Sequence, residues 1–172
     1  MTTILDGLEN PGPRANFWDR HASPVALLIL GSLLLFAAFG GAGGQPSPRT
    51  TAQFGLAEMH VKMPAVIRNG EFFEAVVDIE AGAPLTDATL AVEANLWRDM
   101  TINTMIPAAT EEKFVDGDFR LSYGPLEAGE ILRIKIDGQI NPPLFAGNSG
   151  AIALYDGERL IGTRRFDVSV LP

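Results

Sequence analysis

The residues best suited to chemistry lie in one short segment near position 60. His60 stands between Met59 and Met63, and imidazole and thioether groups are ligands that copper prefers. The surrounding residues alternate between apolar and polar, which predicts a strand with both methionines on one face and His60 on the other. We therefore expect the methionines in the core and His60 at the surface. A copper site, to which Met100 and Met105 would add sulfur ligands, is the weaker interpretation.

A second candidate for chemistry is the densest acidic stretch of the chain, formed by Glu111, Glu112, Asp116 and Asp118. Carboxylates at such spacing are typical of calcium loops. However, the remaining ligand spacing of such a loop is absent, since Arg120 and Leu121 follow Asp116-Gly117-Asp118. The stretch is better interpreted as a solvated loop, and we expect no bound metal.

Nucleophilic catalysis finds no support in the sequence. The chain has no cysteine, which removes thiolate chemistry, disulfides and thiolate metal sites. A serine triad would have to use His60, and the segment Gly147-Asn148-Ser149-Gly150 does not match the G-x-S-x-G turn of such enzymes. The glycine-rich loops that hold phosphates or dinucleotides are also missing. We expect a protein that is not an enzyme and has no cofactor.

The most distinctive element of the chain is the apolar run from Pro24 to Gly43, which contains no charged residue. About 20 helical residues with a rise of about 1.5 Å each span the roughly 30 Å of a bilayer core. The run predicts a transmembrane helix over residues 23–43, with Ser23 as its N-cap and Pro24 in its first turn. A cleaved secretory signal is the alternative, which the acidic segment of about 22 residues before the run makes less suitable.

The basic residues around this run suggest an orientation. Arg14 and Arg20 precede it, whereas Arg49 alone follows it closely. An excess of basic residues marks the cytoplasmic side. We expect residues 1–22 to form a cytoplasmic tail at a bacterial inner membrane, with the C-terminal part in the periplasm.

Residues 56–172 carry the pattern of a β domain, which a Gly/Pro-rich linker over residues 44–55 joins to the helix. Apolar and polar residues alternate in five runs, which indicates strands with one buried face. Asn-Gly and Asp-Gly pairs between the runs provide turns. These runs cover residues 57–63, 73–80, 89–96, 132–137 and 165–170. The predicted fold is mainly β: one transmembrane helix followed by an immunoglobulin-like antiparallel β-sandwich.

Leu126-Glu127-Ala128-Gly129, before the run at 131–136, resembles the leucine-x-x-glycine turn of fibronectin-III-like and other bacterial Ig-like modules. The resemblance covers about a dozen residues. It implies the fold alone, because this fold carries many unrelated functions.

The net charge of -8 disfavours nucleic acid as a partner, because nucleic-acid binding needs a basic surface. Aromatic and arginine side chains near strand ends suggest protein contacts instead. Trp97 and Leu144-Phe145 have the alternative of folding back to cap the sandwich. Gly41 lies in a small-xxx-small pattern that suits helix packing, or in a flexible linker. The candidate contact residues are Trp18, Gly41, Trp97, Arg98, Leu144 and Phe145.

These observations lead to one functional expectation and an alternative. We expect a non-catalytic accessory subunit of a larger integral-membrane complex of the respiratory, photosynthetic or transport kind. Its partners would be the lipid bilayer and other integral-membrane subunits, in a hetero-oligomer. The alternative is a stand-alone anchored binding module that carries copper or a small ligand.

Overall fold

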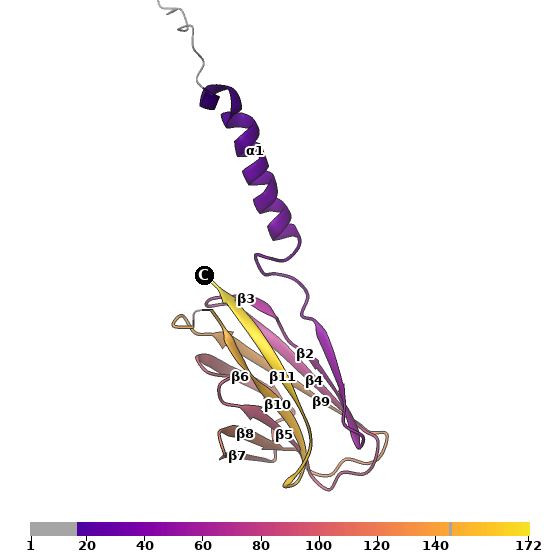
Figure 1. The fold of residues 1–172 in the computed structure, drawn as a ribbon. Helices are drawn as coiled ribbons and strands as arrows, with labels where there is room; N and C mark the ends of the chain where they lie inside the picture. Colours follow the sequence, from indigo (N-terminus) through magenta and orange to yellow (C-terminus); the bar gives the residue numbers. More distant parts are fainter. Residues whose placement is uncertain (1–16, 145) are drawn as a thin grey trace, which may run out of the picture. The chain divides into compact units, whose positions relative to one another are not determined.

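The computed structural model describes residues 17–144 and 146–172, which divide after Gly41 into two compact units (Figure 1). The first unit contains the helix α1 (Phe17–Ala38). It begins well before Ser23, so the prediction of an N-cap at Ser23 and of Pro24 in the first turn was wrong. No Gly or Pro occurs between Phe17 and Ser23, so nothing local stops the helix from extending upstream.

The C-terminal end of α1 is set by glycines. Gly40 has a φ of 85°, its N–H donates to the carbonyl of Ala37, and the N–H of Gly41 donates to the carbonyl of Phe36. This pair of bonds is a Schellman cap, in which a left-handed glycine ends the helix and satisfies its last carbonyls. The helix therefore ends several residues earlier than predicted, before the glycine-rich segment.

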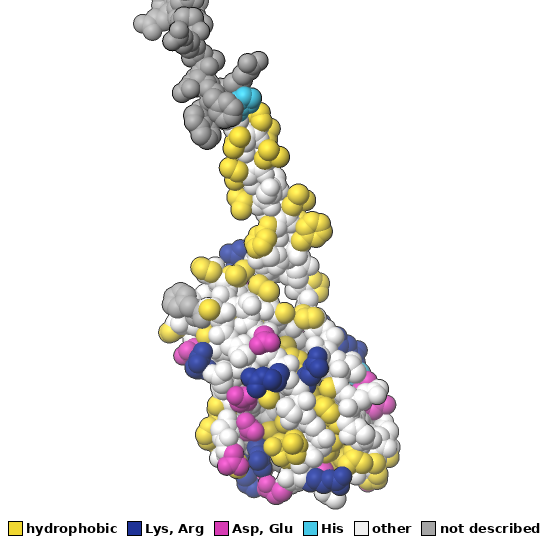
Figure 2. All heavy atoms as spheres, viewed as in Figure 1, with side chains coloured by type: hydrophobic (Ala, Val, Ile, Leu, Met, Phe, Trp, Pro, Cys, Tyr) yellow, Lys and Arg dark blue, Asp and Glu magenta, His cyan; other side chains and the backbone are white. Residues whose placement is uncertain are grey.

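The body of α1 is apolar on all sides. Its 18-residue segment His21–Ala38 has the length and composition of a membrane span, and none of it is buried within the chain. Its large apolar side chains are exposed, and Figure 2 shows those on the face in view. An isolated helix with this surface has no amphipathic face to pack on a soluble core.

The second unit is a sandwich of two sheets. The first sheet has the strand order β1-β2-β4-β9-β6, and the second has the order β3-β11-β10-β5-β8-β7. The strands are β1 (Arg49–Gln53), β2 (Ala57–Lys62), β3 (Val66–Arg68), β4 (Phe72–Ala81), β5 (Ala88–Glu93), β6 (Met100–Ile106), β7 (Glu111–Val115), β8 (Asp118–Ser122), β9 (Ile131–Ile140), β10 (Asn148–Asp156) and β11 (Arg159–Leu171). The prediction of a mainly β protein with a two-sheet sandwich is confirmed.

The alternating pattern explains the core. In β2, Met59 and Val61 point inward and are almost fully buried, and they lie beside Ile79 and Val77 of β4 in an antiparallel register. The opposite sheet contributes Leu90 of β5 and its neighbours to the same core. Burial of these side chains is the main source of stability in such a fold.

Two details of the sandwich differ from the prediction. Residues 49–53, placed in the linker, form β1, which pairs with β2 from Arg49↔Lys62 to Gln53↔Glu58. The sandwich is also not entirely antiparallel, because β3 pairs with β11 in parallel. Pro64 lies between β2 and β3, and its missing N–H interrupts the strand ladder, so the chain leaves the first sheet and joins the edge of the second.

Candidate functional site

The structure confirms the opposite orientation of His60 and its flanking methionines. Met59 and Met63 are buried in the core cluster. The ring of His60 lies on the outer face of the first sheet, where Nδ1 is 2.8 Å from Thr51 Oγ1 and Nε2 is 3.5 Å from Glu58 Oε1. Among the described residues, no group of three or more His, Cys, Asp or Glu is arranged to hold a metal ion. The sulfur and imidazole donors of this segment therefore do not converge.

The acidic stretch forms a β-hairpin rather than a loose loop. β7 and β8 pair in register around the turn at Asp116 and Gly117, with Val115 opposite Asp118. Glu111 Oε2 lies 3.0 Å from Lys113 Nζ, and burial raises the pKa of Asp118. The stretch is largely exposed to solvent, as predicted, but it is not a loop, because β7 and β8 pair along their length on either side of the Asp116-Gly117 turn.

Arg98 stabilises the loop between β5 and β6. Its guanidinium donates to Asn95 Oδ1 at 3.1 Å and to Asn148 Oδ1 at 3.0 Å, and Asn148 Nδ2 donates back to the carbonyl of Arg98. Asn148 is buried at the start of β10. Arg98 therefore fastens its own loop to the start of the neighbouring strand β10, which gives it a structural role, and its contact role stays a prediction.

Leu144 is not available for contacts with a partner. Its side chain is only 2% exposed and belongs to the core cluster. The turn at Pro142 and Pro143 directs it inward, so it caps the sandwich, and its prediction as a contact residue was wrong. Phe145 lies outside the described residues.

Of the predicted contact residues, two belong to the first unit: Gly41 after the end of α1, and Trp18 at its start. Gly41 belongs to the cap that follows α1, and a Cβ there would lie 2.3 Å from the Phe36 ring. Because the helix ends at Ala38, the small-residue pattern does not continue along a helical face. Trp18 lies in the first turn of α1, and its side chain is outside the described residues.

The largest open hollow of those found on the sandwich lies where its two sheets separate at one edge. Its volume is about 630 Å³, and its walls are β6 on one side and the β7–β8 hairpin on the other. Figure 1 shows these three strands at the same edge of the fold. We call this hollow the aromatic groove, because its lining includes Trp97, Phe114 and Phe119. Its size is within the range of ligand and peptide sites.

The three aromatic rings form a continuous row. The ring centroids of Trp97 and Phe119 are 5.5 Å apart, and those of Phe119 and Phe114 are 5.0 Å apart. Exposure rises along the row: Trp97 packs against the core, Phe119 is 38% exposed and Phe114 is 62% exposed. Trp97 thus caps the core and also lines the groove, and its contact with a partner stays a prediction.

A single acidic side chain lies on the inner face of the groove wall. Glu112 lies opposite the buried Leu121 and shares a face of β7 with Phe114. It has no hydrogen-bond or ion-pair partner among the described residues.

Tyr123 lies near Glu112. Burial, and secondarily the negative charge of Glu112, raises the pKa of Tyr123 to about 12. The Tyr123 hydroxyl donates to Met105 Sδ of β6 at 3.6 Å.

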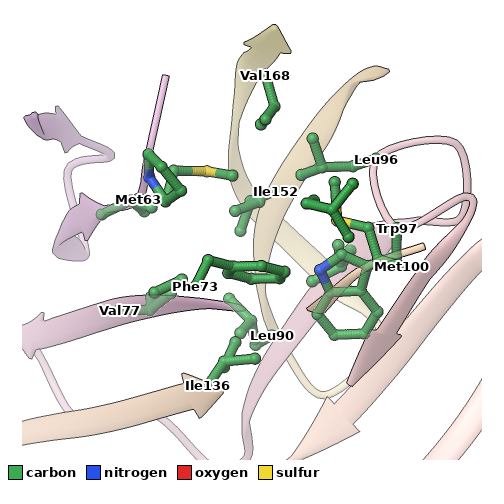
Figure 3. A pocket seen from close by; sticks show the side chains of 15 residues that line it. Met63, Phe73, Val77, Leu90, Leu96, Trp97, Met100, Ile136, Ile152 and Val168 are labelled. Atoms are coloured by element: carbon green, nitrogen blue, oxygen red, sulfur yellow. The ribbon is translucent and has the colours of Figure 1, made fainter. Parts of the chain in front are cut away.

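The core itself leaves no room for a ligand. A cavity of about 20 Å³ lies between the sheets, and Figure 3 shows Met63, Phe73 and Trp97 among the side chains around it. This volume is comparable to that of one water molecule, and its lining is apolar. It is a packing defect rather than a binding site.

The outer face of the first sheet is instead covered by mutual ion pairs. Arg133 binds Asp78 through Nε at 2.7 Å and Nη2 at 3.1 Å, which lowers the pKa of Asp78. Lys135 Nζ lies 2.8 Å from Glu74 Oε2. Because these charges are already paired with one another, the surface attracts a charged partner only weakly.

Phe114 and Phe119 were not predicted as site residues, and Glu112 was considered only as part of a possible calcium loop. One local signal was available: Phe114 and Phe119 flank Val115-Asp116-Gly117-Asp118, and an Asp-Gly turn of two residues places them opposite each other. The separation of β6 from β7, which exposes them, has no local signal.

No protein-family model and no curated protein sequence matches the chain. Similar solved structures include a FixG-related protein from Vibrio parahaemolyticus, with 14% identity over 67% of this chain and 95% of that one and a TM-score of 0.41. The CARDB domain of PF1109 from Pyrococcus furiosus has 13% identity over 64% and 90%, with a TM-score of 0.42. A non-cellulosomal cohesin from Archaeoglobus fulgidus has 12% identity over 65% and 91%, with a TM-score of 0.38.

Proposed function

We propose that this protein is a non-catalytic accessory subunit of a larger integral-membrane complex. In this proposal α1 spans a bacterial cytoplasmic membrane, the N-terminal segment is cytoplasmic, and an immunoglobulin-like sandwich docks on partner subunits in the periplasm. The observation that carries the proposal is the aromatic groove, where Phe114 and Phe119 stay exposed beside a core that has buried most other large apolar side chains.

Exposed aromatic side chains in a groove are characteristic of contact surfaces. Aromatic residues are enriched at the energetic centres of protein interfaces, because a large rigid ring loses little entropy on binding. A row that starts in the core at Trp97 is also held in place before a partner arrives. Such preorganisation lowers the entropic cost of association.

The helix supports the anchored part of the proposal. The described segment His21–Ala38 exposes apolar side chains on every face, and its surface is suited to lipid or to other transmembrane helices. The glycine cap at Gly40 ends the helix before the segment that leads to β1. A sandwich tethered in this way would stay close to the membrane surface, where accessory subunits act.

The immunoglobulin-like assignment is supported by strand order. The block β2-β4-β9-β6 corresponds to the A-B-E-D sheet of that fold, and β11-β10-β5 corresponds to G-F-C. The β7–β8 hairpin is an addition beside β5, and it builds one wall of the aromatic groove. The proposed docking surface is thus the part of the domain that departs from the common arrangement.

The test is a pull-down from native membranes in mild detergent, with the full chain tagged at its C-terminus and partners identified by mass spectrometry. We expect a defined, stoichiometric set of membrane subunits. The same experiment with Phe114→Ala should lose these subunits. Phe72→Ala is the matched control, because Phe72 is 70% exposed but lies outside the aromatic groove. Recovery of the wild-type chain alone would refute the accessory role.

A further inference from the structure

The aromatic groove carries information about the chemistry of its occupant. We propose that it receives an extended segment of a partner protein, which pairs with the free edge of β7 and places a Lys or Arg side chain against Glu112. This inference rests on the proposed function, since it specifies what the docking surface recognises.

The free edge of β7 provides the backbone part of the recognition. β7 is the last strand of its sheet and pairs with β8 on one side alone within the described chain. An edge strand leaves alternate N–H and C=O groups without ladder partners. An incoming extended segment can satisfy these groups by adding one strand, which is a common mode of peptide recognition.

The groove side of β7 provides the side-chain part. Residues that share a face of a strand are spaced by two, so Glu112 and Phe114 both face the groove. An added strand would place one side chain opposite each of them. Phe114 and Phe119 suit a β-branched or aromatic side chain, because such cross-strand pairs are stabilising.

Glu112 then selects the charge of the neighbouring side chain. Its carboxylate faces a groove whose other wall presents Met105 and Ile102, and no described residue neutralises it. Lys113 also contributes to the lining of the groove, but its ammonium group is paired with Glu111 at 3.0 Å. A basic group from the occupant would therefore be the counter-ion, whereas an acidic or apolar one would leave the charge unpaired in a partly apolar site.

The length of the segment follows from β7 itself. β7 has five residues, and it faces the groove through Glu112 and Phe114. The occupant is thus a short stretch in which one inward position is basic and the adjacent inward position is apolar, with polar residues between them. A globular surface without a protruding extended segment could not enter the space between β6 and β7.

The test uses the full chain in mild detergent and a fluorescently labelled synthetic peptide in which Val and Thr alternate and one central Val is replaced by Lys. We expect saturable binding by fluorescence anisotropy, with slower amide exchange in β7. Binding should weaken about tenfold when the peptide Lys is replaced by norleucine, which corresponds to about 1.4 kcal/mol, and it should weaken further when the Lys is replaced by Glu.

Variants of the protein complete the test. Glu112→Gln should weaken binding of the Lys peptide about tenfold and leave binding of the norleucine peptide unchanged. Glu158→Gln is the matched control, because Glu158 is exposed and pairs with Arg120, away from the groove. Equal binding of all peptides, or equal binding by Glu112→Gln, would overturn the inference. So would the absence of any binding together with self-association of Glu112→Val, which would show that Glu112 serves only to protect the edge.

The two proposals can fail separately. Peptide binding without stoichiometric membrane partners would contradict the accessory role and keep the recognition of a basic segment. Partners recovered through Phe114 without any peptide binding would contradict the inference and keep the accessory role.

Discussion

The ring of Phe114 lies 5.0 Å from the ring of Phe119, across the β7–β8 hairpin, and more than half of it is exposed to solvent. A tilted aromatic pair at this distance is favourable, but most of the apolar surface of Phe114 remains exposed to solvent and so adds little to stability. The pair therefore combines a small contribution to stability with a large potential contribution to binding.

The first prediction separates these two contributions. Phe114→Ala should lower the free energy of unfolding by only about 1 kcal/mol, the value of an exposed aromatic pair. It should nevertheless reduce capture of partner subunits at least tenfold, as expected for a residue at the centre of an interface. Urea unfolding and quantitative pull-down measure the two effects on the same preparation. A large loss of stability together with unchanged capture would reverse the interpretation.

The second prediction concerns Leu144, whose side chain is 2% exposed. Leu144→Ala should destabilise the sandwich by about 2–5 kcal/mol, because it removes a buried side chain and leaves a cavity. Leu160→Ala is the control, since Leu160 is exposed on β11 and should change stability little. Equal stability of the two variants, measured by urea unfolding, would show that Leu144 does not cap the core.

The third prediction uses the ion pair between Asp78 and Arg133. The pKa of Asp78 is lowered below its ordinary value of 3.8, first by its hydrogen bonds with Arg133. The unfolded chain therefore binds this proton more readily than the folded chain does. Its contribution to stability is fully present above pH 3.8 and is lost as the pH falls through the lower pKa of the folded state.

Asp78→Asn tests this dependence. The variant should be less stable than the wild type by about 2 kcal/mol at pH 7, and the difference should shrink as the pH falls below about 4. Asp167→Asn, at an exposed position of β11, is the control and should change stability little at pH 7. A constant difference between Asp78→Asn and the wild type down to pH 2 would contradict the assignment.

The fourth prediction tests the orientation of the anchor. The chain has no cysteine, so single cysteines can be introduced without interference. Ala128→Cys, in the exposed turn before β9, should react with a membrane-impermeant maleimide in spheroplasts. Thr3→Cys should react only after lysis. The opposite pattern would place the sandwich in the cytoplasm. If neither cysteine reacted before lysis, the sandwich would also be assigned to the cytoplasm.

The sequence by itself determined the properties that depend on local periodicity. The alternation around Met59 and His60 places them on opposite faces of β2, as observed, because successive side chains of a strand point to opposite sides. The sequence also predicted a two-residue hairpin turn at Asp156-Gly157. The hairpin is present, but Asp156 pairs with Arg159 at the end of β10, so the turn residues are Gly157 and Glu158. The apolar run of α1 was recognised because it is contiguous in the sequence, although its limits were not.

The tertiary structure decided what depends on residues far apart in the chain. Leu144 and Phe114 are both apolar residues in or beside turn-rich segments, yet one is buried and the other exposed. That difference arises because the 141–144 turn closes over the core, whereas β6 and β7 belong to different sheets that separate at their edge. Local patterns specify which residues are apolar and how they alternate; only the packing of one sheet on the other decides which of them are left without a cover.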